Sequence, residues 1–148
     1  MKKFQFSLEN VKKYKEQILD SLKMEHAVLL EQVRHQENII RELEKQYHAY
    51  NAELIEKNSK GITTLELCQY KQYLRIMQHK IKEQFSLLEQ LKNEEQKKKE
   101  QVVEVKTETA SFEKLKEKRW IEYRKLEQKE EELLIDEMIS NKMHREKA

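Results

Sequence analysis

Proline is absent from this 148-residue sequence, and glycine occurs only once, at Gly61. A compact domain of this length needs many turns, and turns depend on Gly, Pro, Asn, Asp and Ser because their backbones or side chains stabilise turn conformations. The scarcity of such residues favours long, uninterrupted helices instead. Charged residues make up 39% of the chain, which would also suit intrinsic disorder. Disordered segments lack apolar periodicity, however, and this sequence keeps such a periodicity over most of its length.

The first part of the chain repeats apolar residues at alternating steps of three and four, the heptad spacing of a helix that faces a partner helix. The order of the steps changes once, near His26, which corresponds to a four-residue stutter that unwinds a supercoil locally. This pattern predicts a first helix over about residues 5–58. Its positions are Leu8, Val11, Lys15, Ile18, Leu22, His26, Leu29, Val33, Gln36, Ile40, Leu43, Tyr47, Tyr50 and Leu54.

The second part of the chain keeps the same heptad spacing without any break, which is expected only of a long continuous helix. We therefore predict a second helix over about residues 64–145. Its positions are Leu67, Tyr70, Leu74, Met77, Ile81, Gln84, Leu88, Leu91, Glu95, Lys98, Val102, Val105, Thr109, Phe112, Lys116, Arg119, Tyr123, Leu126, Glu130 and Leu133.

A turn at about residues 59–63 separates the two patterns. Gly61 suits the left-handed residue that follows a helix end, and Thr63 with Glu66 has the spacing of a capping box that begins a helix. The sequence thus predicts an all-α fold: a long two-helix antiparallel coiled-coil hairpin, with helix two longer than helix one. We expect residues 1–148 to form a single coiled-coil domain.

The two patterns also suggest which residues face each other. After reversal at the turn, facing residues have numbers that sum to about 122–125. Leu54 then meets Leu67 and Tyr70, and the stutter at His26 lies opposite polar positions of helix two, Glu95 and Lys98. A slip of one heptad fits the apolar residues almost as well.

Several functional classes find little support. Its 30 basic and 28 acidic residues alternate in sign, so the chain lacks the basic stripe of a nucleic-acid binder. A two-helix coiled coil encloses no dry pocket, which argues against an enzyme, a cofactor or a small-molecule substrate. His48 and His79 could approach each other across the hairpin, but ordinary surface histidines are the simpler interpretation than a metal site. No segment resembles a signal peptide or a membrane span, so we expect a cytoplasmic protein.

Two surfaces are predicted to bind proteins. Helix one ends opposite about residue 117, leaving about thirty residues of helix two without a partner, and an unpaired apolar stripe marks a binding surface. This open-end surface comprises Trp120, Tyr123, Leu126 and Leu133. A second surface near the turn, the tip surface, comprises Tyr47, Tyr50, Tyr70, Tyr73 and Ile76. Its tyrosines at heptad positions also suit a core, and scattered surface apolar residues are common.

The opening residues Phe4-Gln5-Phe6-Ser7-Leu8-Glu9-Asn10-Val11, followed by Lys12-Lys13-Tyr14-Lys15, resemble the start of the bacterial flagellar export FliJ family. That family opens with F-x-F-x-L-x-x-[VL]-L and continues into basic residues. Lys12 departs from the pattern, because it stands where the family often has a second aliphatic residue. The chain length, the single glycine near the hairpin and the tyrosines that flank it also match.

The resemblance implies a stalk-like coiled coil of the flagellar type III export apparatus, needed for motility and chemotaxis. Its implied partners are the hexameric export ATPase, which it binds and stimulates, the ATPase regulator and the cytoplasmic domain of the membrane export gate. A chaperone-like role toward export substrates or their chaperones is also implied, as is peripheral association with the membrane export apparatus.

The open-end surface would then enter the ATPase ring, with Lys116, Arg119 and Arg124 near the channel wall, and the tip surface would contact the gate. The alternative is a cytoskeletal or scaffold coiled coil that forms a parallel dimer, with Gly61 only a kink.

Overall fold

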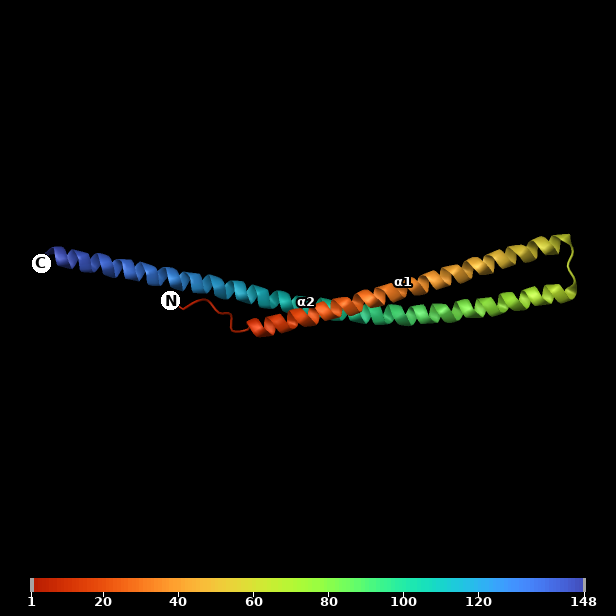
Figure 1. The fold of residues 1–148 in the computed structure, drawn as a ribbon, viewed down its shortest axis with the longest axis horizontal. Helices are drawn as coiled ribbons and strands as arrows, with labels where there is room; N and C mark the ends of the chain where they lie inside the picture. Colours follow the sequence, from red (N-terminus) through yellow and green to blue (C-terminus); the bar gives the residue numbers. More distant parts are fainter. Residues whose placement is uncertain (1, 148) are drawn as a thin grey trace. The chain divides into compact units, whose positions relative to one another are not determined.

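A computed structural model of the chain describes residues 2–147 and contains two helices, α1 (Glu9–Lys60) and α2 (Thr64–Lys147), of 52 and 84 residues (Figure 1). The helices pack against each other as an antiparallel hairpin, and α2 is the longer. The predicted fold class is therefore confirmed. Within residues 2–147, neither helix carries a stretch apolar enough to cross a membrane.

The chain divides into two compact units, and each is described by itself. The turn unit, Ser21–Val102, holds most of α1, the connecting loop and the first part of α2. The open-end unit combines the residues before Ser21 with those after Val102. That residues 1–148 behave as a single domain stays a prediction.

The start of α1 lies at Glu9, so the predicted start near residue 5 is too early. The Glu9 N–H donates to the carbonyl of Phe6 over 3.0 Å, and the first helical bond runs from the Lys12 N–H to the Leu8 carbonyl over 2.9 Å. A carboxylate in the first turn favours this helix start because it faces the positive end of the helix dipole. Residues 2–8 are not helical, and we call them the N-terminal strap.

The connection between the helices is short and matches the predicted turn. Gly61 has a φ of 92°, the left-handed region that residues with a Cβ rarely adopt, and its N–H lies 3.4 Å from the Asn58 carbonyl oxygen. The Glu66 N–H donates to the Thr63 hydroxyl oxygen over 3.2 Å, which satisfies one free donor at the start of α2. The chain reverses here (Figure 1), so Gly61 is not merely a kink in one continuous helix.

The apolar core of the turn unit consists of residues that the heptad pattern predicted to face each other. Leu54, Tyr70 and Leu74 form a buried cluster, and Leu67 packs against it. The predicted meeting of Leu54 with Leu67 and Tyr70 is therefore confirmed. Burying a side chain of this size contributes about 1.5–3 kcal/mol, so this cluster alone favours the hairpin over separated helices.

The stutter in α1 is matched by polar partners on α2. His26 Nε2 lies 2.7 Å from Glu95 Oε1, and Lys98 Nζ donates to Glu25 Oε2 over 2.7 Å. These contacts confirm the predicted pairing of the stutter with Glu95 and Lys98. A slip of one heptad would separate both pairs.

A buried polar pair lies on the turn side of the stutter. Gln36, only 7% exposed, donates from Nε2 to the backbone oxygen of Gln84 over 3.0 Å and to its side-chain oxygen over 2.6 Å. A buried amide without such partners would destabilise the hairpin. The pair therefore fixes the register as well as satisfying the amide.

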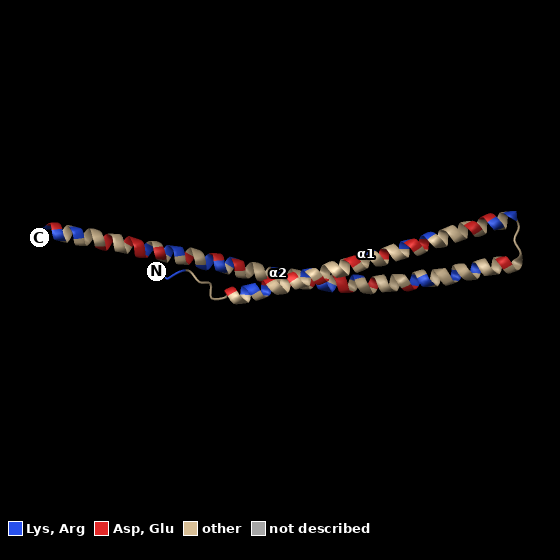
Figure 2. Ribbon diagram, viewed as in Figure 1, with Lys and Arg blue, Asp and Glu red and all other residues tan. Residues whose placement is uncertain are grey.

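Ion pairs join the helices in the open-end unit. Lys15 lies 2.8 Å from Glu108, and Lys116 lies 3.0 Å from Glu9. The hydrogen bond from Lys116 lowers the pKa of Glu9, and the one to Glu108 raises the pKa of Lys15. Figure 2 shows acidic and basic residues interspersed along both helices. The charges therefore pair locally rather than forming one broad face of a single sign.

Candidate protein-binding surfaces

The tip surface combines core and exposed aromatic side chains in the turn unit. The ring of Tyr50 lies 4.8 Å from that of Tyr70 and 4.3 Å from that of Tyr73. Tyr70 is buried, whereas Tyr73 is 44% exposed, and Ile76, one turn further along α2, is 50% exposed. Tyr47 packs against the same core. Tyr73 and Ile76 are therefore the members of the tip surface that a partner could reach.

Polar contacts hold the tip aromatics in place. The Tyr70 hydroxyl donates to Glu53 over 3.2 Å, and Gln78 donates to the Tyr47 hydroxyl over 2.8 Å. The Lys57 ammonium lies 5.2 Å from the centre of the Tyr70 ring, within the range of a cation–π contact. A hydrogen bond with Tyr70 raises the pKa of Lys57.

The N-terminal strap contacts the open-end surface. The Phe4 ring packs edge-on against Trp120, with centroids 5.2 Å apart, and lies 5.5 Å from the Tyr123 ring. Phe6 is buried, and the Arg119 guanidinium lies 5.7 Å from the centre of its ring. Offset and edge-on aromatic pairs of this kind add about 0.5–1.5 kcal/mol beyond the area they bury.

Hydrogen bonds fix the strap at both ends. Arg119 donates to the Ser7 hydroxyl over 2.7 Å, and the Tyr123 hydroxyl donates to the backbone oxygen of Lys2 over 2.8 Å. The prediction that α2 lacks an intrachain partner from about residue 117 onward is therefore wrong for Trp120 and Tyr123. It failed because an extended strand covers more length per residue than a helix, so residues 2–8 reach further along α2.

The last part of α2, after Tyr123, is largely exposed. Beyond Tyr123, the ion pair of Arg124 with Glu127 at 3.6 Å and the hydrogen bond from Gln128 to Glu132 over 3.4 Å both lie within α2 itself. Leu126 and Leu133 are 56% and 64% exposed. The cations suggested for the channel wall are partly engaged, because Lys116 pairs with Glu9 and Arg119 binds Ser7. Leu126 and Leu133 are thus the members of the open-end surface that lie beyond the strap, and Trp120 stays 44% exposed beside it.

Comparison with known families decides the assignment. The sequence profile described as "Flagellar FliJ protein" matches residues 4–148, nearly the whole chain. The chain belongs to the flagellar FliJ family. No match was found among curated proteins or among solved structures. Family membership places the protein in the flagellar export apparatus, in which FliJ members are generally non-catalytic components.

The family profile matches the chain from residue 4 and so includes most of the strap, whose residues 5–8 the heptad pattern assigned to the first helix. Phe4 and Phe6 alternate with polar residues at a period of two, which is the signal of extended backbone. That alternation could have revealed the strap. In the described part of the chain, no group of three or more His, Cys, Asp or Glu side chains is placed to hold a metal ion.

Proposed function

We propose that the chain is a stalk-like component of the export apparatus whose open end binds and stimulates the hexameric export ATPase. One observation supports this most directly: the apolar side chains of α2 continue, exposed, past the last contact with the N-terminal strap. Leu126 and Leu133 stand on this stretch, next to the half-covered Trp120 and Tyr123. An exposed apolar stripe on a helix lowers its free energy when a partner covers it.

The chain itself supplies no group for hydrolysis. Stimulation would instead follow from binding, since a ligand that binds only the assembled ring shifts the equilibrium toward that ring. The ring then hydrolyses ATP with its own residues. The exposed end of α2, a continuous helix that carries Leu126 and Leu133, supports entry of this helix into the ring.

A double substitution tests the open end. Leu126→Ser with Leu133→Ser should lower stimulation of the ATPase several-fold, because two apolar contacts are lost. Met24→Ser with Val28→Ser is the matched control, because these residues of the turn unit are also well exposed, at 72% and 58%. Stimulation equal to that of the unsubstituted chain, at unchanged helicity, would place the ATPase contact elsewhere.

We further propose that the tip surface docks the cytoplasmic domain of the export gate. Tyr73 and Ile76 are exposed beside a fixed aromatic core, and aromatic side chains commonly anchor protein interfaces. Tyr73→Ala with Ile76→Ala should weaken binding of the gate domain by about tenfold or more. Phe85→Ala, at a residue that is 47% exposed on the same helix, should leave binding unchanged.

The melting temperature separates a docking role from a packing role for these two residues. If it falls while binding per folded molecule stays the same, Tyr73 and Ile76 belong to the core alone. The ATPase regulator and export chaperones are further partners that we propose on family membership, together with peripheral association with the membrane apparatus.

A further inference from the structure

The end of α2 carries a second apolar face that the open-end surface does not include. Residues at steps of three and four line this C-terminal face, and all of them are exposed. Leu134 and Ile139 flank them on either side. Successive residues of a helix are turned by about 100°, so Leu133 points roughly opposite to Ile135. The face consists of Gln128, Glu131, Ile135, Met138, Lys142 and Arg145.

The C-terminal face is complementary to itself when reversed. If two copies cross antiparallel about a point between Asp136 and Glu137, each Ile135 opposes Met138 of the other copy, and Leu134 and Ile139 lie along the two edges of this apolar centre. Glu131 then opposes Lys142, and Gln128 opposes Arg145. Apolar residues meet apolar residues, Glu131 meets the oppositely charged Lys142, and the neutral Gln128 meets Arg145, so the face is complementary to itself as a two-fold interface requires. A parallel pair would instead set Glu131 against Glu131 and Lys142 against Lys142.

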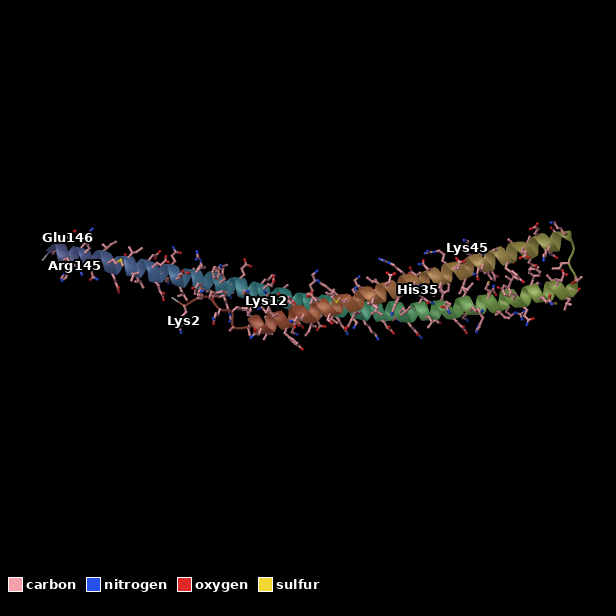
Figure 3. All side chains as sticks on the ribbon, in the orientation of Figure 1. Lys2, Lys12, His35, Lys45, Arg145 and Glu146 are labelled. Atoms are coloured by element: carbon pink, nitrogen blue, oxygen red, sulfur yellow. The ribbon has the colours of Figure 1, made fainter. Side chains whose placement is uncertain are left out.

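We propose that the C-terminal face binds a second copy of this chain in an antiparallel pair. The charge distribution supports this occupant, because Glu130, Glu131 and Glu132 precede the apolar residues while Lys142 and Arg145 follow them. Figure 3 labels Arg145 near the end of α2, where no other segment of the open-end unit lies beside the helix.

The part of α2 that follows the strap is long enough to hold the C-terminal face. The last contact with the N-terminal strap is the bond from Tyr123 to Lys2. The C-terminal face begins after it, at Gln128, and extends about 26 Å to Arg145 at 1.5 Å per residue. In the antiparallel arrangement Arg145 of one copy lies opposite Gln128 of the other, so the paired residues all follow the last strap contact at Tyr123.

The pair would be weak. Only Leu134, Ile135, Met138 and Ile139 of each copy supply apolar contacts, and an interface of this size lies below that of stable complexes. We expect dissociation constants of roughly tens of micromolar. The proposal goes beyond the function proposed above and uses other residues, so Leu126→Ser with Leu133→Ser should leave the pairing unchanged.

Sedimentation velocity of the full chain over a wide concentration range tests the pairing. The apparent mass should rise from that of one chain, 18.2 kDa, toward twice that value. Ile135→Glu with Met138→Glu should hold the chain at the lower mass, with unchanged helicity by circular dichroism. A full chain that stays at 18.2 kDa at every concentration would overturn the proposal.

Exchanging the charges of Glu131 and Lys142 tests both the antiparallel orientation of the pair and whether the partner is a second copy of this chain. Glu131→Lys alone and Lys142→Glu alone should each weaken the pairing about tenfold, because each creates two like-charge contacts. Combining both substitutions in one chain should restore it. Lys129→Glu makes the same charge change as Lys142→Glu on the opposite side of the helix, and should have little effect. Failure of the combined variant to recover would rule out the antiparallel arrangement.

Discussion

At the scale of single residues, one backbone conformation separates this hairpin from a continuous helix. Gly61 has the only positive φ among the described residues, at 92°, and a Cβ added there would meet no atom within 4 Å. The cost of a side chain at this position is therefore conformational rather than steric crowding. Residues with a Cβ adopt this region at a cost of about 1–2 kcal/mol.

Gly61→Ala should accordingly lower the free energy of unfolding by about 1 kcal/mol, without changing the fold. Chemical denaturation followed by circular dichroism measures this change. Lys60→Ala, at the exposed last residue of α1, is the neighbouring control and should have almost no effect. Equal stabilities for Gly61→Ala and the unsubstituted chain would show that the turn tolerates residues with a Cβ.

Glu9 gives a prediction about pH. Its hydrogen bond with Lys116 lowers its pKa from the ordinary value of 4.5. The folded state therefore binds fewer protons than the unfolded state at acid pH, so the stabilisation is full above about pH 4.5 and is lost as the pH falls through the lowered pKa. Glu9→Gln should lower the melting temperature at pH 7 and should have less effect at pH 3. A difference that does not shrink at acid pH would contradict this account.

At the scale of elements, the N-terminal strap is the part of the fold that the heptad periodicity could not reveal. A heptad pattern reports only helical positions, whereas the strap packs by aromatic contacts and two hydrogen bonds. The line of heptad residues along each helix, its seam, was predictable because residues at steps of three and four return to the same buried side at every turn. Gln36 and Thr109 illustrate this, since heptad spacing placed both on the seam and both are buried despite being polar.

Binding surfaces were harder to predict than the seams. The sequence marked Trp120 and Tyr123 as apolar residues beyond the reach of α1, but only coordinates show Phe4 against both rings. Tyr70 likewise stood at a heptad position and was also predicted to belong to the tip surface. It is buried, so it belongs to the core. Periodicity predicts that one side of a helix is covered. It does not predict which segment covers that side when the segment, like the strap, has no heptad repeat.

The strap can be monitored directly, because Trp120 is the single tryptophan of the chain. Phe4→Ala should remove the edge-on ring contact and expose the indole, which shifts its fluorescence emission to longer wavelength and increases quenching by acrylamide. Phe85→Ala, in the turn unit, should leave the emission unchanged. An unshifted spectrum for Phe4→Ala would show that the strap does not cover Trp120 in solution.

At the scale of the whole molecule, we propose three binding surfaces that share no residues: the tip surface, the open-end surface and the C-terminal face. Substitutions can therefore test each surface without changing the residues of the others. The FliJ family assignment gives the setting in which such surfaces would act, since an export apparatus joins several proteins. In the function we propose, the open end stimulates the ATPase without contributing a catalytic group.

The most direct test measures ATP hydrolysis by the purified hexameric export ATPase as increasing amounts of this chain are added. The full chain is compared with a chain ending at Arg124, which retains the N-terminal strap and its contacts with Trp120 and Tyr123. Ile135→Glu with Met138→Glu is the control, since it removes self-pairing and leaves the open-end surface intact. We predict full stimulation by the control and loss of stimulation by the shortened chain, with its tryptophan emission unchanged. Equal stimulation by the full and shortened chains would contradict the account.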